Sequence, residues 1–479
     1  MRSARKGYEA DMRDSTKTSE VNRPRRESVP LVVWVFVAII GLAMAVVAQD
    51  ATPLTLADAA KMTLANNPMH KAALADTKAA LAGVREARAP MLPRIMFAEN
   101  FTAGNDPVFV FGAKLRQQEF TVADFAPNSL NRPTPMGNYA SRFSGQWNLF
   151  DSTQSWKALD RAKFMNAAAE QQLNRTDQEL VFQTVQAFYG VLLAQKQVQV
   201  AEDAVKTVEA IELQSRARVE SGMAVDSDLL SAQVQYSARQ QELIERRNQL
   251  ALAQTRLALA MGAGSDAIYQ PKEALEERAF PAADVNQLEK TAMERRPDLK
   301  RSEAERSAQD KSVSMAKAAF GPRLNGFGSW EENSHSVGWT GANNWVAGAE
   351  LQFDLFSGGA KRAQLAREKA LQERAAAGHA GFQDAVRLEV RQAYYQFDAA
   401  QQQVKVARGA IAQADESLRI NQNRYESGLS TVTDMLRVEE AAHRAKADYW
   451  QAVYRMNASY AGVELATGTL TTDSPAVTQ

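Results

Sequence analysis

Three carboxylates are the residues whose type and placement could do chemistry in this chain. Asp226 and Asp228 lie in the stretch RVESGMAVDSDLL, and Asp434 lies in the closely similar stretch RYESGLSTVTDML. Carboxylates grouped at one opening create a negative potential that attracts cations. A single Asp in such a place also serves to cap the start of a helix. The residues alone leave both uses open.

The sequence gives little support for a catalytic, nucleotide-binding or metal-binding site. No H-E-x-x-H, G-x-S-x-G or Walker A motif occurs. The Gly262-Ala263-Gly264 run lacks the preceding strand of a dinucleotide site. The four histidines are far apart and form no paired-ligand spacing: His70, His335, His379 and His443. We therefore predict a protein that is not an enzyme, with no catalytic, cofactor-binding or metal-binding residues.

The charge balance and the absence of cysteine exclude several kinds of binding partner and site. Lys plus Arg and Asp plus Glu both total 56 in 479 residues. Nucleic-acid binding by phosphate neutralisation needs a basic excess, so no nucleic acid is expected. The absence of cysteine excludes a thiolate metal site, a cysteine nucleophile and a disulfide framework.

The N-terminal region predicts export through the inner membrane. A basic stretch ending at Arg26 precedes the apolar segment VPLVVWVFVAIIGLAMAVVA, residues 29–48, and QDATP follows at once. This is the pattern of a secretory signal peptide cleaved after Ala48. An uncleaved membrane anchor is the alternative, because the segment is long enough to span a bilayer.

The rest of the chain reads as two copies of one unit. WNLF at 147–150 matches FDLF at 353–356, and Gly222 and Gly262 match Gly428 and Gly468, all at an offset of 206 residues. We predict five regions: signal 1–48, first unit 49–262, connection 263–284, second unit 285–468 and C-terminal tail 469–479.

Each unit has the same predicted elements. A short helix ends at a proline, Pro68 or Pro297, and a helix of about 20 residues follows. Residues 94–104 with 139–150, and 323–333 with 343–356, alternate in polarity and predict two β-hairpins. Proline-free helical patterns then cover 151–219 and 358–425, each followed by a glycine turn and a second long helix. The stripe Val181, Val185, Phe188 and Leu192 predicts narrow helix-on-helix packing.

The glycine turns predict helical hairpins. Gly222 and Gly428 can take the left-handed conformation that ends a helix. Residues that can cap the following helix are Ser227 or Asp228, and Thr431 or Thr433.

Four strands cannot close a barrel, and a membrane does not tolerate an open sheet edge. Other chains must therefore complete the sheet. Two copies would give about eight strands and three copies about twelve, so the arithmetic alone permits a dimer or a trimer.

In the order and spacing of these motifs the sequence resembles the TolC-like outer membrane efflux proteins. The resemblance rests on the pattern L-x-x-A-x-x-x-A-x-x-N-N-P, the two-fold repeat, the hairpin endings WNLFD and FDLFS, the glycine turns and the ending LATG, and it covers roughly residues 54–470.

The resemblance implies an α+β membrane protein with two internal repeats. Long antiparallel α-helices would form a trimeric α-barrel across the periplasm, and four strands per chain would contribute to a 12-stranded transmembrane β-barrel in outer membrane lipid. It also implies a homotrimer that works with a periplasmic adaptor and an inner-membrane transporter of RND or ABC type. The function implied is small-molecule efflux.

The same resemblance places the two turns at the periplasmic gate, where the adaptor docks. Tyr425 and Asp434 match a Tyr and an Asp of the family's closing network, whereas Ser430 and Arg437 stand where the family has an Arg and a second Asp. Several carboxylates would lie near the threefold axis. The gate and docking residues implied are Gly222, Asp226, Asp228, Gly428, Tyr425, Ser430, Asp434 and Arg437.

One segment breaks the symmetry of the units. Pro93 and Trp147 are 54 positions apart, whereas Pro322 and Phe353 are 31 apart. The extra residues lie in NDPVFVFGAKLRQQEFTVADFAPNSLNRPTP, and long loops of outer-membrane barrels lie outside the cell. We predict an extracellular loop over the barrel exit.

Two other functions compete. The outer-membrane conduit of a type I protein secretion system would use the same architecture. A structural periplasmic coiled-coil protein would explain the long helices, but it would need neither the signal segment nor four alternating strands.

Overall fold

The computed structural model describes residues 52–281 and 284–478. The predicted signal at 1–48 and part of the predicted connection lie outside these residues. Within the described ranges, no helix is both long and apolar enough to cross a membrane.

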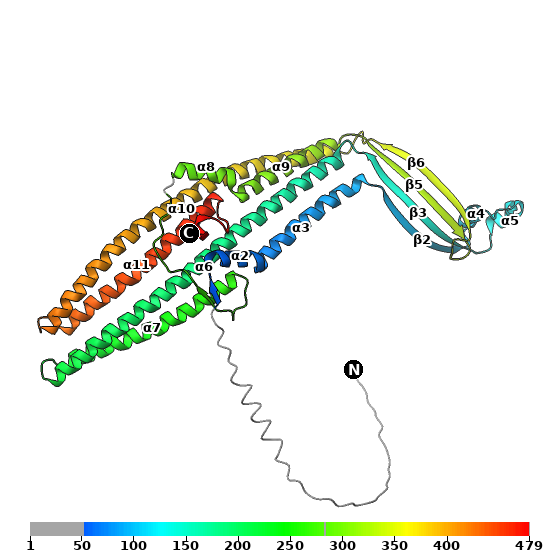
Figure 1. Ribbon diagram of the computed structural model, residues 1–479. Helices are drawn as coiled ribbons and strands as arrows, with labels where there is room; N and C mark the ends of the chain where they lie inside the picture. The colour runs from blue at the N-terminus through cyan, green and yellow to red at the C-terminus, as the bar shows by residue number, and fades with distance from the viewer. Residues whose placement is uncertain (1–51, 282–283, 479) are drawn as a thin grey trace, which may run out of the picture. The chain divides into compact units, whose positions relative to one another are not determined.

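The chain alternates helical and extended blocks (Figure 1). In order, the elements are β1 (Thr52–Leu54), α2 (Leu56–Asn66), α3 (Pro68–Arg88), η1 (Ala89–Met91), β2 (Arg94–Gly104), α4 (Pro107–Arg116), η2 (Val122–Phe125), α5 (Pro127–Asn131), β3 (Met136–Phe150), α6 (Gln154–Glu220), α7 (Asp226–Ala260), β4 (Tyr269–Pro271), α8 (Val285–Arg295), α9 (Pro297–Ala318), β5 (Arg323–Ser334), β6 (Ala342–Gln352), α10 (Ala360–Glu426), α11 (Val432–Thr467) and α12 (Pro475–Thr478).

The long helices confirm the sequence prediction. α6 and α10 have 67 residues each, and at ~1.5 Å per residue each is about 100 Å long. Both begin two or three residues later than predicted. The reason is that Thr153 and Gly359, at the two N-caps, have positive φ angles of 72° and 84° and stand outside the helix.

The four predicted strands form one antiparallel sheet in the order β2-β3-β5-β6 (Figure 1). β6 ends at Gln352, so the prediction that the strand continues through residues 353–356 is wrong. Its partner β5 begins at Arg323, opposite Gln352, and is preceded by Pro322, which has no N–H to donate. The outer edges of β2 and β6 pair with no strand in the described part of the chain.

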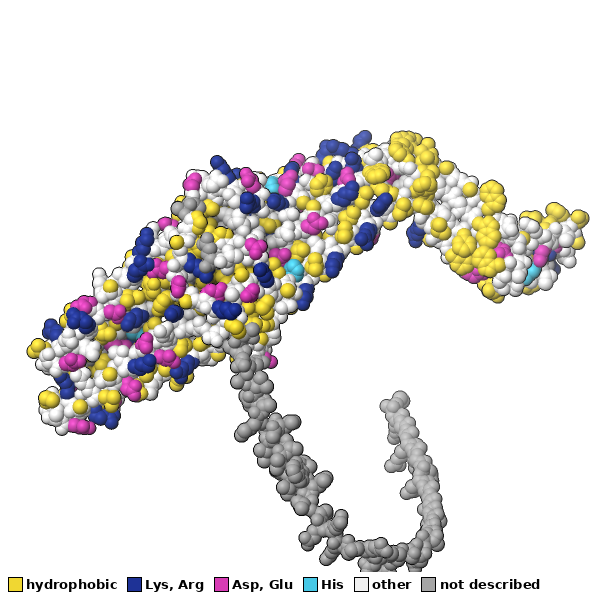
Figure 2. Space-filling view, in the orientation of Figure 1, with side chains coloured by type: hydrophobic (Ala, Val, Ile, Leu, Met, Phe, Trp, Pro, Cys, Tyr) yellow, Lys and Arg dark blue, Asp and Glu magenta, His cyan; other side chains and the backbone are white. Residues whose placement is uncertain are grey.

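The sheet has two chemically different faces, because successive residues of a strand point to opposite sides. The register places most of the large aromatic and aliphatic side chains on one face, here called the apolar face: Ile95, Phe97, Phe101, Tyr139, Phe143, Trp147, Leu324, Trp330, Trp345 and Leu351. Glu99, Ser141, Glu332 and Asn343 lie on this face as well. The other face, called the polar face, has Arg94, Asn100, Asn138, Arg142, Gln146, Asn325, Glu331, Asn333, Asn344 and Glu350, together with the apolar Met96, Phe327 and Val346. In Figure 2, hydrophobic side chains gather over the sheet, whereas charged ones are spread along the helices.

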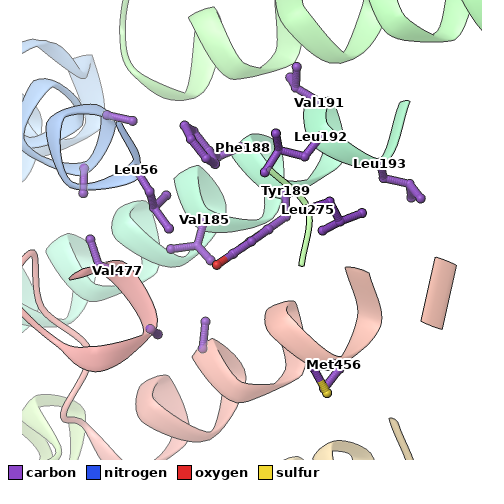
Figure 3. Packing of buried hydrophobic residues seen from close by; sticks show 14 of the residues in the cluster. Leu56, Val185, Phe188, Tyr189, Val191, Leu192, Leu193, Leu275, Met456 and Val477 are labelled. Carbon is purple, nitrogen blue, oxygen red and sulfur yellow. The ribbon is translucent and has the colours of Figure 1, made fainter. Parts of the chain in front are cut away.

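The main core surrounds the middle of α6. Val181, Val185, Phe188 and Leu192 are all at most 2% exposed, but so are Tyr189 and Val191 (Figure 3). The predicted narrow stripe is therefore wrong here. Helix α6 is buried nearly all round at this level because α2, α7 and α11, together with Leu275, pack around it, and α12 packs in turn against α2 and α11.

Three short elements, β1, β4 and α12, complete this core and were absent from the sequence prediction. β1 pairs in parallel with β4, with Leu54 opposite Pro271. In the predicted tail, Ala476 and Val477 of α12 are buried in the core. Elements of three or four residues are too short to show a hydrophobic period.

Two glycines allow the chain to cross itself closely. Gly262 (φ +70°) and Gly468 (φ +72°) follow the long return helices α7 and α11. A Cβ on Gly262 would lie 2.7 Å from Asn67 Cα, and one on Gly468 would lie 2.8 Å from Arg296 Cα. Asn67 Nδ2 donates to Ala260 O at 2.8 Å, and Arg296 Nη1 donates to Ala466 O at 3.1 Å. The residue before each proline thus caps the end of a return helix.

Alanine should destabilise the protein more at a glycine of a chain crossing than at a glycine of an open turn. Gly262→Ala should lower the unfolding temperature strongly, because it adds a backbone clash to the ~1–2 kcal/mol strain of the left-handed conformation. Gly222→Ala is the matched control, since Gly222 has φ +73° but open space around its Cβ position. Circular dichroism of the purified variants measures both, and equal losses would contradict the role given to the crossing.

Candidate functional site: the two helix turns

The two turns end their helices in the same way. Met223 N donates to Arg218 O at 2.8 Å, and Leu429 N donates to Arg424 O at 2.8 Å. Together with the left-handed Gly222 and Gly428, these bonds form the Schellman motif. The prediction that these glycines end the helices is confirmed.

The following helices begin differently. Thr431 is the N-cap of α11 and its side chain accepts from Asp434 N at 3.1 Å, as predicted for Thr431. The N-cap of α7 is Val225, so the predicted caps Ser227 and Asp228 are wrong. The helix starts one residue before Ser227, and Asp226 and Asp228 lie in its first turn, where carboxylates stabilise the positive end of the helix dipole.

A small separate core joins the two turns. Its buried members come from all four long helices: Ile211, Ala232, Tyr425, Val432 and Met435. The Tyr425 hydroxyl lies 2.9 Å from Ser215 Oγ, which links α10 to α6 inside this core. The turns are therefore packed together within one chain.

Arg218 makes the principal polar link between the turns. Its Nη2 donates to Tyr425 O at 2.5 Å and to Glu426 O at 2.9 Å, and its guanidinium lies 4.5 Å from the centre of the Tyr425 ring. It thus caps the last carbonyls of α10, where a cation is favourable. Sequence reasoning missed this residue, although Arg218 opens the repeated stretch.

The other predicted gate residues are not brought together into one network. Arg437 Nη2 lies 3.3 Å from Asp434 Oδ1, one helical turn away. The hydrogen bond from Thr431 lowers the pKa of Asp434, which stays ionised at neutral pH. Ser430 is half-buried, and Asp226 is exposed. Among the predicted gate residues, within the described part of the chain, only the Tyr425 side chain makes a hydrogen bond to another long helix.

Further along the helices, a buried ion cluster links α7 to α11. Arg239 Nη2 donates to Glu439 Oε2 at 3.0 Å and also contacts Glu440, and Arg239 Nη1 donates to Glu242 at 2.9 Å. His443 Nε2 lies 3.7 Å from Glu242 Oε1. Arg239 and Glu439 are buried. Breaking a buried pair of this kind is costly, because one charge stays without its partner.

Burial sets the charge states in this cluster. Burial raises the pKa of Glu439, even though Arg239 opposes the shift. Burial lowers the pKa of His443 from its ordinary value of 6.5, and the charge of Arg239 lowers it further. His443 is therefore neutral at neutral pH.

The other histidines each have local partners. His70 Nδ1 lies 2.6 Å from Asp177 Oδ1, His335 Nε2 lies 2.6 Å from Glu119 Oε2, and His379 Nδ1 lies 3.1 Å from Ser302 Oγ. Over residues 52–281 and 284–478, no group of three His, Cys, Asp or Glu side chains could hold a metal ion.

Long helical hairpins joined to an antiparallel sheet with one apolar face define the fold of outer-membrane channel proteins. VceC of Vibrio cholerae superposes with a TM-score of 0.71 at 18% identity, over 86% of this chain and 96% of VceC. CusC gives 0.74 at 16% identity, over 88% and 95%. Identity this low shows the fold alone.

The chain belongs to the outer membrane efflux protein family, whose sequence profile matches residues 59–263 and 288–469. It is 25% identical to the alkaline protease secretion protein AprF of Pseudomonas aeruginosa over 452 residues, 90% of this chain and 89% of AprF. It is 23% identical to the outer membrane protein TolC of Vibrio cholerae over 420 residues, 85% and 88% of the two chains.

The Arg218 link predicts that its loss loosens the turns. Arg218→Ala removes two bonds to helix-end carbonyls, at a cost of about 1–2 kcal/mol in this half-exposed setting. Spin labels at Met223→Cys and Leu429→Cys should show a broader distance distribution by electron paramagnetic resonance. Arg216→Ala is the control, because Arg216 binds Glu212 on its own helix. An unchanged distribution for Arg218→Ala would refute the link.

The ion cluster predicts acid sensitivity through His443. A histidine with a lowered pKa takes up its proton more readily when the helices separate, so acidification below about pH 6.5 favours separation. Protonation of Glu439 acts in the opposite direction, since its raised pKa favours the packed state. Spin labels at Gln240→Cys and Ala441→Cys should therefore report more broadening on acidification in the parent than in His443→Gln.

The comparison of the parent protein with His443→Gln isolates the effect of His443, because the other charged groups of the cluster are unchanged. Arg246 and Glu440 also face the cluster, but both are present in parent and variant alike. An equal response of the two proteins between about pH 7.5 and about 5.5 would show that His443 is not the responsible group.

Proposed function

We propose that this protein is the outer-membrane channel component of a tripartite efflux system and exports small molecules across the periplasm and outer membrane. The observation that carries the proposal is the sheet with one apolar and one polar face, joined directly to helices about 100 Å long. The apolar face suits lipid and the polar face suits a water-filled lumen.

Three copies would complete the sheet. The free edges of β2 and β6 would pair between neighbours and give a closed barrel of about twelve strands. No strand edge would then face lipid. A dimer with about eight strands is the smaller alternative, and the family resemblance favours the trimer.

Exposed apolar stripes support the same assembly for the helices. On α10, Leu388, Tyr395, Val406 and Ile420 are exposed, and spacings of 7, 11 and 14 residues fall on one face of a helix. α3 buries no residue, and its exposed Leu74 and Leu81 are seven apart. Neighbouring subunits would cover these stripes and form the periplasmic α-barrel.

The two turns would form the periplasmic mouth and dock the adaptor. Met223, Val225 and Leu429 are 74%, 62% and 70% exposed there, which leaves apolar anchors for a partner protein. Asp226, Asp228 and Asp434 from three chains would favour cations at the mouth. An RND or ABC transporter in the inner membrane would supply the energy, and a cleaved signal at 1–48 would direct export.

The two units, 49–262 and 285–468, would derive from one repeat, and the equal lengths of α6 and α10 support this. Type I protein secretion is the second candidate function. The name of the relative AprF, an alkaline protease secretion protein, favours it, since that similarity spans 90% of this chain.

Native mass of the protein extracted from separated outer membranes tests the assembly. A closed oligomer is expected after subtraction of detergent, because only closure satisfies the edge strands, and the family resemblance favours the trimer over the dimer. A monomer, or protein confined to the soluble fraction, would exclude the channel and favour a structural coiled-coil protein. In a deletion strain, increased sensitivity to small toxic compounds supports efflux, whereas loss of one secreted protein without such sensitivity supports secretion.

A further inference from the structure

The segment between β2 and β3, which the sequence predicts to be an extracellular loop, is a folded unit that contains α4, η2 and α5. Asp106 caps α4 by accepting from Phe109 N at 2.8 Å, and Lys114 Nζ lies 2.5 Å from Asp124 Oδ1. Phe111, Phe120 and Phe125 pack edge to face, with ring centres 4.7 and 5.1 Å apart. Local caps and these aromatic contacts hold residues 105–135 together. In Figure 1, α4 and α5 lie at the end of the sheet away from the long helices.

This unit is attached to the polar face of the sheet. Gln117 Nε2 donates to Asn138 Oδ1 at 2.7 Å, and Asn138 Nδ2 donates to Asn333 Oδ1 at 2.8 Å. All three side chains are buried. Asn344, also on the polar face, donates to Arg116 O at 3.0 Å. These contacts lie at the end of the strands farthest from the long helices.

The neighbouring connection, between β5 and β6, goes to the opposite face. Trp339 stacks on Trp330 with ring centres 5.5 Å apart and lies 5.8 Å from Phe143. Both partners belong to the apolar face, and aromatic side chains are typical of the border between lipid and water. Trp339 of this connection thus packs on the apolar face, whereas the α4–α5 unit packs on the polar face, and the His335–Glu119 contact joins the two connections.

We propose that residues 105–135 form a lid over the exit of the channel, which limits the size of the molecules that leave it. The proposal rests on the proposed function, because the polar face lines the lumen only in a closed barrel. Three lids would then converge on the barrel axis. The lid is held by a latch, defined here as Gln117, Asn138 and Asn333.

The latch contains both paired and unpaired buried amide groups. Two buried amide hydrogen bonds stabilise it, but Gln117 Oε1 is buried without a partner in the described structure. Such an atom loses its hydration without compensation, which weakens the latch. The hydrogen bond from Lys114 lowers the pKa of Asp124 to about 2, so acidification in the physiological range leaves this contact inside the lid intact.

Cysteine labelling of intact cells tests the lid from outside, independently of the periplasmic mouth. The natural chain has no cysteine, so Ser144→Cys places one thiol in the middle of the polar face, below the lid. A small membrane-impermeant maleimide and a bulky polyethylene glycol maleimide are compared in the intact protein and in a variant whose residues 106–134 are replaced by a short Gly-Asn turn. Removal of the lid should raise the rate of labelling by the bulky reagent at least about tenfold, because the latch no longer has to open.

A point variant covers the case in which the shortened protein does not assemble. Gln117→Ala should raise the rate of bulky labelling about fivefold, the effect of losing roughly one hydrogen bond. Gln118→Asn is the matched control, because Gln118 is exposed and Asn tolerates its left-handed backbone. Equal rates in Gln117→Ala and the parent protein, or with and without the lid, would overturn the proposal.

A second thiol separates failure of the lid from failure of the channel. Ser336→Cys lies in the β5–β6 connection and should react with the small reagent in every variant. If it reacts only after cell lysis, the far end of the sheet does not face the outside, and the proposed channel function is wrong together with the lid.

Discussion

The unpaired edges of one four-stranded sheet constrain the rest of this structure. Backbone N–H and C=O groups on the outer sides of β2 and β6 need partners, and lipid offers none. In the proposed channel the apolar face lies in lipid, so the partners of these groups would come from strands of other copies of the chain and not from water. The long helices that leave the same sheet would then gather around the same axis, which would account for the exposed apolar residues of α3 and α10.

The two halves share a backbone design and differ in chemistry. The crossing at Gly262 is capped by the amide of Asn67, whereas the crossing at Gly468 is capped by the guanidinium of Arg296. At the turns, Arg218 reaches the end of α10, while Arg424 stays near its own turn and donates to Leu429 O at 3.4 Å. The two halves of one chain therefore share their backbone geometry but not the side chains that cap it.

The features that could be predicted are those that depend on the spacing of apolar residues and on the glycines and prolines that end an element. Long helices, the glycine turns and the alternating strands follow from patterns that each element carries in itself. Contacts between distant elements could not be predicted in this way. Arg218 finds Tyr425 only because α6 and α10 end together, and Gln117 finds Asn138 only because a helical segment folds back on its sheet. The cap at Val225 was missed because no side-chain hydrogen bond marks it.

The placement of the main core gives the helices mechanical leverage. Phe188 lies at the centre of the core, and 32 residues of unbroken helix separate it from Glu220, a distance of roughly 50 Å. If that core acts as a fulcrum, a tilt of about 5° displaces the end of the arm by about 4 Å. A tilt of this size near Phe188 would therefore move the turn by about 4 Å, the length of one side-chain contact.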